Sequence, residues 1–154
     1  MLRSIQHGIG SILLLFILTG CTQEALTTTQ LKIAERPFTV FVADSPLERT
    51  RGLADIVHLA DDEGMIFLFP TRTPQTFWMK DVEYPIDIVW ISQRQIVGYI
   101  TAQPEAITTA STDYQLYQSA QPVDTVVELP AGTVARLGLQ IGDNVVIGST
   151  LDVD

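Results

Sequence analysis

The sequence has few of the side chains from which most metal and nucleophile sites are built. Its 154 residues include one cysteine, Cys21, and two histidines. A single cysteine excludes an intramolecular disulfide and a site of several thiolates, and two histidines are too few for most multi-imidazole sites. We expect His58, in IVHLADD, to be a structural or surface residue rather than a catalytic base. We therefore expect no metal and no cofactor, and the sequence assigns no catalytic residue.

Positive charge is also scarce. The chain carries 9 Lys and Arg against 18 Asp and Glu, for a formal net charge of −9 at pH 7. No run of basic residues is present, and phosphate contacts require clustered Lys and Arg. Glycine-rich nucleotide-binding motifs of the Walker and Rossmann kinds are missing as well. The composition therefore predicts a protein that does not bind nucleic acid.

The longest apolar block, IGSILLLFIL, stands near the N-terminus. It is shorter than the roughly 20 residues that span a membrane, and its length suits a secretory signal peptide. It leads to Leu18-Thr19-Gly20-Cys21, which resembles the lipobox of bacterial lipoproteins. The resemblance implies cleavage before Cys21 and acylation of this cysteine. The alternative is a plain signal peptide or membrane anchor with a chance cysteine.

This resemblance predicts how the chain is organised and where it is located. Residues 1–20 are the expected lipoprotein signal peptide, and 21–30 are the lipidated cysteine and a polar tether. Thr22 follows the cysteine, and by similarity to Gram-negative sorting it favours the outer membrane over the inner. We thus expect an exported protein, anchored in the cell envelope by lipid and facing the periplasm. Residues 31–148 form the expected single domain, and 149–154 an acidic tail.

The body of the chain reads as short strands separated by turns. We expect a small α+β fold that is mainly antiparallel, barrel- or sandwich-like, with two short helices. One helix follows Ser45, which with Glu48 forms a capping box, and the other ends at Gly138. Residues 101–122 are a long polar connection, of the kind that is usually functional or mobile. The expected strands are 31–34, 37–43, 64–69, 76–80, 86–92, 96–100, 125–130 and 144–148.

One carboxylate stands out within the apolar stretch QTFWMKDVEYPIDIVWI at 75–91. Asp87 shares a strand face with apolar neighbours, which is costly unless the carboxylate is paired or hydrogen-bonded. Its predicted partners are Lys80, Arg49 and Arg51, in a polar cluster beside Trp78. The alternative is that Asp87 lies at the strand end and caps a turn after Pro85. Phe77 and Met79 would face the core if 76–80 is extended.

Several segments together resemble one known family. ERTRGL, DEGMIFLFP, FWMKDVEYPIDIVWI, and VVELPAG with LGLQIGDNVVI occur in an order and spacing similar to the bacterial and archaeal domain of unknown function 192. The resemblance covers about Leu31 to Ile147. This sequence departs from the family pattern at Ala54, where Met is usual, and in having Val82 after Asp81, where Asn-Thr is typical. It also lacks a Cys that is often seen in the loop before the last strands. The resemblance implies a compact β-rich fold, with exported members, and supplies no activity.

Three functions remain open. The first is a binding or accessory module for a small or glycan-like ligand, with Tyr114 and Tyr117 as a lid. The second is an assembly partner of another envelope protein. The third is a carboxylate-dependent hydrolase that uses Asp87 with Glu63 or Glu128. The predicted ligand-binding residues are Arg49, Arg51, Glu63, Trp78, Lys80, Asp87 and Glu128.

Overall fold

The computed structural model describes residues 26–105 and 114–148. The expected signal peptide, Cys21 and the acidic tail lie outside these residues. The described chain is mainly strand with two short helices, which confirms the predicted α+β class. Its elements are β1 Thr28–Ile33, β2 Arg36–Ala43, α1 Pro46–Arg51, β3 Glu63–Thr73, β4 Thr76–Phe77, β5 Ile86–Ser92, β6 Gln95–Ala102, β7 Tyr117–Gln118, β8 Val123–Pro130, α2 Thr133–Leu137 and β9 Val145–Ile147.

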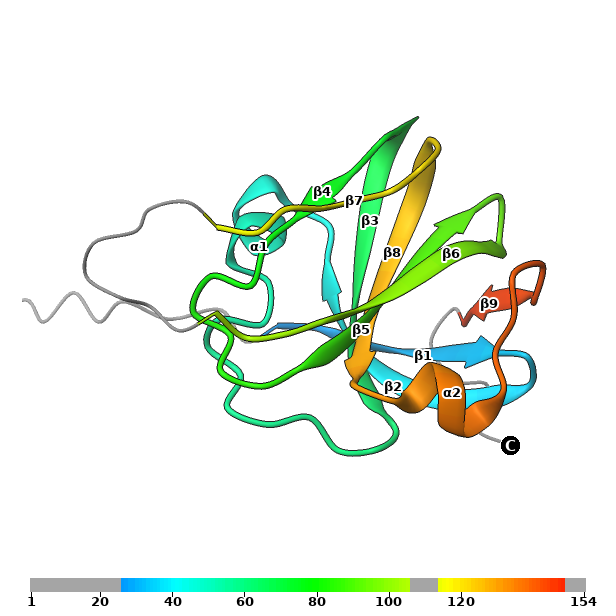
Figure 1. Cartoon of the computed structure of the whole chain (residues 1–154). Coiled ribbons are helices and arrows are strands. Elements are labelled where there is room, and N and C mark those ends of the chain that lie inside the picture. The colour runs from blue at the N-terminus through cyan, green and yellow to red at the C-terminus, as the bar shows by residue number, and fades with distance from the viewer. Residues whose placement is uncertain (1–25, 106–113, 149–154) are drawn as a thin grey trace, which may run out of the picture.

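Seven of the strands form one curled sheet in the order β6-β5-β8-β3-β2-β1-β9 (Figure 1). Its two edges approach each other, because Gln95 at the start of β6 bridges Asn144 just before β9. The backbone N–H of Ile96 also donates to the Asp143 carbonyl at 3.0 Å. These contacts curl the sheet into a half-barrel, as the barrel-like expectation implied.

One strand pair departs from the antiparallel pattern. β2 and β3 run parallel, with Val40 opposite Gly64, whereas the other neighbours in the large sheet are antiparallel. Parallel neighbours need a long crossover connection, and the segment between these strands supplies one that contains α1. This crossover places α1 next to the interior of the half-barrel, beside β4 (Figure 1).

The central strands β5 and β8 of the sheet are buried on both faces. One apolar cluster contains Leu53, Phe67, Met79 and Trp90 and lies on the side covered by α1 and β4. The other contains residues of β1 and β2 together with Leu139 after α2. Because β5 lies between the two clusters, its residues Ile86–Ile91 are all buried. This explains why its sequence reads as an almost continuous apolar run.

The helix boundaries follow local signals. At α1 the Ser45 side chain accepts the Glu48 N–H and the Glu48 carboxylate accepts the Ser45 N–H, so the predicted capping box is present. Gly52 ends α1 with φ +53°, a conformation that L side chains rarely adopt. The second helix ends at Gly138, as predicted. No helix in residues 26–105 or 114–148 is long and apolar enough to cross a membrane.

The expected strand 76–80 is shorter than predicted. Only Thr76–Phe77 is strand, and it pairs with β7 from the long connection. The chain then leaves the extended conformation and turns at Asp81, where φ is +59°. Met79 is still buried, at 2% exposure, while Trp78 and Lys80 are exposed. The prediction of inward and outward residues thus held for these three even though the strand ends early.

Candidate functional site

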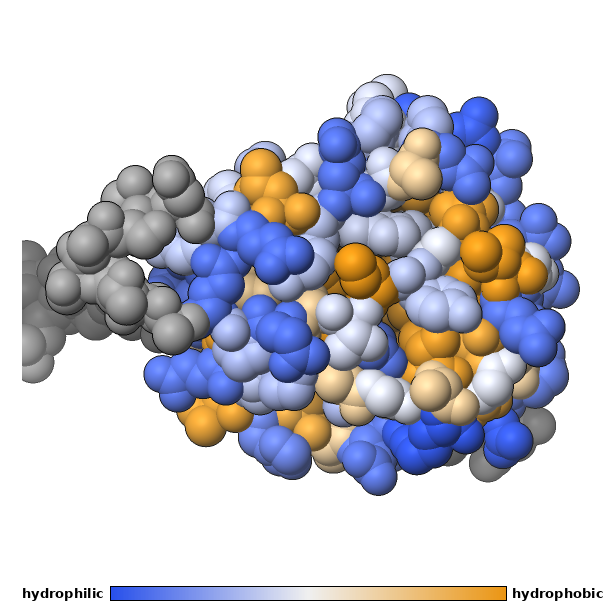
Figure 2. Space-filling model, in the orientation of Figure 1, coloured by the Kyte–Doolittle hydropathy of each residue, from blue (hydrophilic) through white to orange (hydrophobic). Residues whose placement is uncertain are grey.

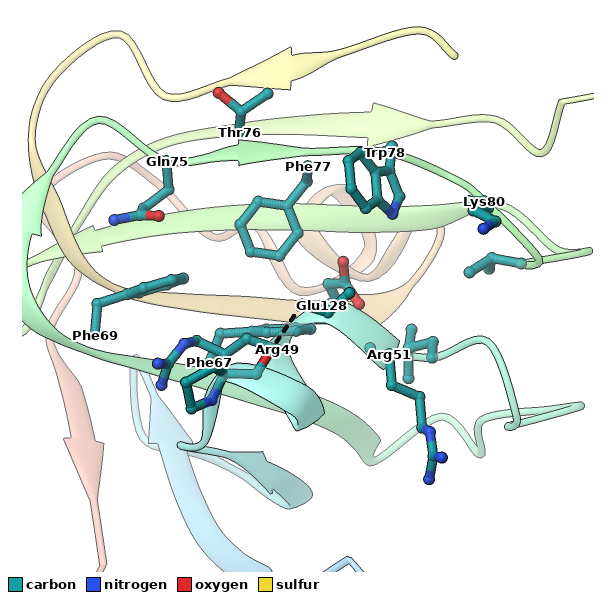
Figure 3. Close-up of a pocket in the computed structure, with 15 residues that line it drawn as sticks. Arg49, Arg51, Phe67, Phe69, Gln75, Thr76, Phe77, Trp78, Lys80 and Glu128 are labelled. Carbon is teal, nitrogen blue, oxygen red and sulfur yellow. Dashed lines mark hydrogen bonds between the residues drawn. The ribbon is translucent and has the colours of Figure 1, made fainter. Parts of the chain in front are cut away.

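A pocket of about 350 Å³ opens between α1, β3 and the segment that begins with β4 (Figure 3). The crossover helix forms one wall, the 75–82 segment forms another, and β8 contributes one residue from the sheet. This volume lies within the range of small-molecule sites. The pocket is lined by Pro46, Arg49, Thr50, Arg51, Gly52, Leu53, Phe67, Phe69, Gln75, Thr76, Phe77, Trp78, Lys80, Val82 and Glu128.

Five of the seven residues proposed from the sequence line this pocket: Arg49, Arg51, Trp78, Lys80 and Glu128. They come from three separate parts of the chain. The parallel pairing of β2 with β3 brings α1 toward the 75–82 segment, and the pairing of β3 with β8 brings in Glu128. The structure therefore gathers most of the predicted set around one hollow.

Aromatic side chains form much of the pocket. Phe77 packs edge-on against Phe67 at 4.9 Å and against Phe69 at 6.5 Å between ring centroids. On its other side Phe77 meets Trp90 at 5.5 Å. Trp78 follows at the mouth with 46% of its surface exposed. The space that a ligand could occupy is therefore lined by four aromatic residues, Phe67, Phe69, Phe77 and Trp78; Trp90 supports Phe77 from outside the pocket lining.

Sequence reasoning missed Phe67 and Phe69 as pocket residues. They lie two apart on one face of β3, in a run that reads simply as core. Phe77 was also expected to be core, but it is only partly buried and lines the pocket. The spacing of the two phenylalanines could have indicated this role, because residues two apart in a strand share a face and these two lie on the side that α1 covers.

Arg49 is held in place by backbone oxygens rather than by a carboxylate. Its Nη1 donates to the Leu68 carbonyl at 2.9 Å and also to the Asp44 carbonyl. Its guanidinium lies over the Phe69 ring, 5.5 Å from the centroid, which is cation–π geometry. These contacts tie α1 to β3 and orient the guanidinium at one end of the pocket.

The other two cations differ in their surroundings. Arg51 forms an ion pair with Asp55, with Nε 3.2 Å from Oδ2, and both side chains are exposed. Such a surface pair contributes little to stability. Lys80 is exposed and lies at the end of the pocket away from Phe69 in Figure 3. Its ammonium forms no ion pair with the described residues.

Glu128 is the acidic residue of the pocket. It lies on β8 between Met65 of β3 and Ile88 of β5 and is 4% exposed. Burial raises the pKa of Glu128 to about 8, because the low-dielectric interior disfavours the charged form. No described side chain or backbone group within residues 26–105 and 114–148 donates a hydrogen bond to its carboxyl. At neutral pH the protonated form therefore predominates and can both donate and accept a hydrogen bond.

Tyr84 has a buried hydroxyl near this carboxyl. Its oxygen has no hydrogen-bond partner within the described residues. Burial raises the pKa of Tyr84 to about 12, and the negative charge of Glu128 adds to the rise. Tyr84 does not line the pocket, and no function is assigned to its hydroxyl.

Asp87 does not belong to the pocket, which corrects the prediction of a cluster with Lys80 and the arginines. It is 2% exposed and accepts the Thr101 hydroxyl at 2.7 Å and the Val134 N–H at 2.9 Å. The second bond satisfies a free N–H in the first turn of α2. Asp87 thus caps α2, through a residue 47 positions further along the chain. Neither the predicted cationic partners nor the predicted turn after Pro85 is correct.

Glu63 and the proposed lid are also placed elsewhere. The Glu63 carboxylate accepts the Ala60 N–H at 2.9 Å and closes its own turn. Tyr117 is 5% exposed, and its hydroxyl accepts the Gln103 N–H at 3.3 Å. Neither Tyr117 nor Tyr114 lines the pocket. His58 is exposed, in line with the structural or surface role expected for it.

The geometry defines a small β-rich half-barrel with one aromatic, cation-rimmed pocket beside its crossover helix. The chain belongs to the family DUF192, described as "Uncharacterized ACR, COG1430", whose model matches residues 28–147. This confirms the resemblance seen in the sequence. No curated protein matches the chain.

Two solved structures are similar over most of their length. The crystal structure of a candidate transcription regulator from Sinorhizobium meliloti 1021 is 30% identical, with a TM-score of 0.72, and the match covers 81% of this chain and 97% of that one. A protein of unknown function from Novosphingobium aromaticivorans DSM 12444 is 28% identical, with a TM-score of 0.70, over 81% and 89% of the two chains. These similarities support the fold and family.

Proposed function

We propose that this chain is a binding module of the cell envelope that holds a small, ring-shaped ligand, such as a sugar, in the pocket beside α1. One observation carries the proposal. A buried carboxyl, Glu128, without a hydrogen-bond partner among the described residues, lies beneath the aromatic pair Phe77 and Trp78 (Figure 3). This carboxyl opens onto the pocket, so a bound hydroxyl can take the place of water there and exchange hydrogen bonds with it.

The chemistry of a sugar suits these groups. A sugar ring has an apolar face that stacks on an aromatic side chain, and its hydroxyls exchange hydrogen bonds with carboxyl and guanidinium groups. Trp78 at the mouth offers the stacking surface, and Gln75 on the same wall offers an amide. A pocket with aromatic walls and a few converging polar groups is the usual form of a small-ligand site.

Lipid anchoring is part of the same proposal. The apolar block and the lipobox-like Leu18-Thr19-Gly20-Cys21 support export and acylation of Cys21, and Thr22 supports the outer membrane. In this arrangement the domain faces the periplasm, where envelope glycans are within reach. Mass spectrometry of the protein from membranes tests it directly, since acylated Cys21 would be the N-terminal residue.

The contents of the pocket favour binding over hydrolysis. Most glycosidases need two carboxyls roughly 5 to 10 Å apart across the cleft. Glu128 is the one acidic residue among those that line the described pocket, because Asp87 and Glu63 serve as caps elsewhere. We therefore rank the hydrolase below the binding module as a candidate function.

An assembly role is the second candidate, and one surface favours it. The edge strand β6 exposes Tyr99 and Ile100 at 47% and 42%, and nearby Leu116 is 61% exposed. Figure 2 shows apolar residues in patches between polar ones on the face that carries β6. An exposed strand edge with apolar side chains can accept a partner strand.

A thermal-shift screen tests the binding module. The purified protein is heated with a panel of monosaccharides and peptidoglycan fragments, and a ligand at 100 times its Kd should add about 2.7 kcal/mol of stability. Trp78→Ala should abolish the shift. Tyr99→Ala is the matched control, because Tyr99 is 47% exposed against 46% for Trp78 and lies outside the pocket. Equal loss of binding in both variants, or no shift with any compound, would refute the proposal.

A further inference from the structure

The pocket has a charge balance opposite to that of the chain. The whole sequence has a net charge of −9. In contrast, three basic residues, Arg49, Arg51 and Lys80, line the pocket together with the single acid Glu128. Burial keeps Glu128 largely protonated at neutral pH. The pocket is therefore locally positive on an acidic protein, and a positive cleft concentrates anions.

Arg49 is the cation best placed to bind a ligand. One nitrogen, Nη1, is occupied by the Leu68 and Asp44 carbonyls. The remaining N–H groups of its guanidinium have no partner among the described residues, and no described carboxylate lies within 4 Å of it. Backbone oxygens and the Phe69 ring fix the orientation of the guanidinium but leave its positive charge uncompensated. A guanidinium held in this way is preorganised for a carboxylate or phosphate.

The neighbouring cations have different roles. Arg51 already pairs with Asp55, and Figure 3 shows its guanidinium directed away from Glu128. Lys80 is free of ion pairs with the described residues and lies at the far end of the pocket from Arg49 in that view. Glu128 lies between these two ends. A ring with one anionic substituent could therefore place the anion on Arg49 and a hydroxyl on Glu128.

We infer that the ligand of this pocket is an acidic sugar or similar ring acid, whose anionic group is bound by Arg49 while its ring lies against Phe77 and Trp78. The inference rests on the proposed function and narrows it to one charge class. The shared chemistry is an anion on a ring, which a carboxylate or a phosphate could supply. It distinguishes the site from one for neutral sugars, which would need no uncompensated guanidinium.

Matched pairs of compounds test the inference. Isothermal titration of the full chain in detergent compares glucose with glucuronate, galactose with galacturonate, and N-acetylglucosamine with N-acetylmuramate. Glucose 6-phosphate forms a separate arm that distinguishes phosphate from carboxylate. We expect at least one acid to bind about tenfold or more tightly than its neutral partner, as charge-assisted hydrogen bonds to arginine imply. Raising the salt concentration should weaken the acid and leave the neutral sugar unchanged.

Two variants locate the effect. Arg49→Gln should remove the preference for the acid, and Arg36→Gln should keep it, because Arg36 is exposed in the β1–β2 hairpin and outside the pocket. If Arg49→Gln fails to fold through loss of its bond to Leu68, Arg49→Lys serves instead, because it keeps a cation and a donor for that carbonyl but lacks the guanidinium fork and should weaken the preference for the acid. Lys80→Gln is then a second control that should keep the preference. Lys80 makes no hydrogen bond or ion pair with the described residues that its loss could disturb.

The outcomes separate the inference from the function on which it rests. Tighter binding of an acid that Arg49→Gln abolishes supports both. Neutral sugars that bind as well as their acids overturn the inference and leave the binding module standing. A preference for acids that survives in Arg49→Gln also overturns it, because the anion is then bound elsewhere. If no compound of any pair binds, both the inference and the binding module are overturned.

Discussion

The ionisation of Glu128 should make the stability of the fold depend on pH. Glu128→Gln is the informative change, since it keeps the shape of the side chain and removes the titrating group. Burial raises the pKa of this carboxyl from 4.5 to about 8 in the folded protein. The folded state therefore holds the proton more tightly than the unfolded state. The contribution of Glu128 to stability should be greatest below pH 4.5 and should be lost as the pH rises through 8.

The magnitude follows from the two pKa values. At about 1.36 kcal/mol per pH unit, the interval between them corresponds to a loss of roughly 5 kcal/mol in the free energy of unfolding. Because the open pocket admits water to the carboxyl, we expect a measured loss of about 2 to 5 kcal/mol. Glu128→Gln should lack this loss and should be the more stable protein at pH 9.

Urea unfolding followed by tryptophan fluorescence measures the effect between pH 5 and pH 9. Subtracting the Glu128→Gln curve from that of the wild type isolates the contribution of this one carboxyl. Glu83→Gln is the control, because Glu83 is exposed and its loss changes the net charge equally. Parallel pH profiles for wild type and Glu128→Gln would show that the carboxyl is well solvated in the folded protein. The inference that burial of Glu128 in the pocket raises its pKa would then be wrong.

Three further substitutions test the packing around the site. Tyr84→Phe removes a buried hydroxyl that has no partner among the described residues. Chemical denaturation should show unchanged stability or a gain of about 1 kcal/mol. A clear loss of stability would show that the hydroxyl forms a hydrogen bond. Asp87→Ala leaves the Val134 N–H unpaired and should cost about 2 to 4 kcal/mol without changing ligand affinity, measured by denaturation and titration. Gly64→Ala would place a Cβ 2.5 Å from the Glu128 carbonyl oxygen and should cost about 1 to 3 kcal/mol, so an unchanged melting temperature would contradict the close approach.

Local features of the fold were predictable because their causes lie within a few residues. Ser45 and Glu48 form the capping box that their spacing predicts, and Gly138 ends α2. The expected strands 86–92 and 96–100, joined by a tight polar connection, pair as the β5–β6 hairpin. Such features depend on propensity and short-range hydrogen bonds, which any sequence displays directly.

The prediction for Asp87 failed for the opposite reason. The sequence correctly marks it as a carboxylate that needs a partner, and the structure gives it two. The Val134 N–H comes from α2, which only sheet pairing of β5 with β8 brings beside it. A cationic partner is the obvious guess from composition, but a backbone N–H is available at every helix start and cannot be recognised by residue type.

The sequence by itself determined the short strands and helices, the acidic charge, the lipobox-like start and the residue types that any site must use. Only the tertiary structure decided which of them meet. The parallel pairing of β2 with β3 sets α1 beside the 75–82 segment, and β8 joins them from the other side of β3. Arg49, Phe69 and Glu128 thereby line one pocket although they are far apart in the chain. Strand order sets these contacts, and strand order depends on how the whole sheet buries both faces, which no short stretch of sequence contains.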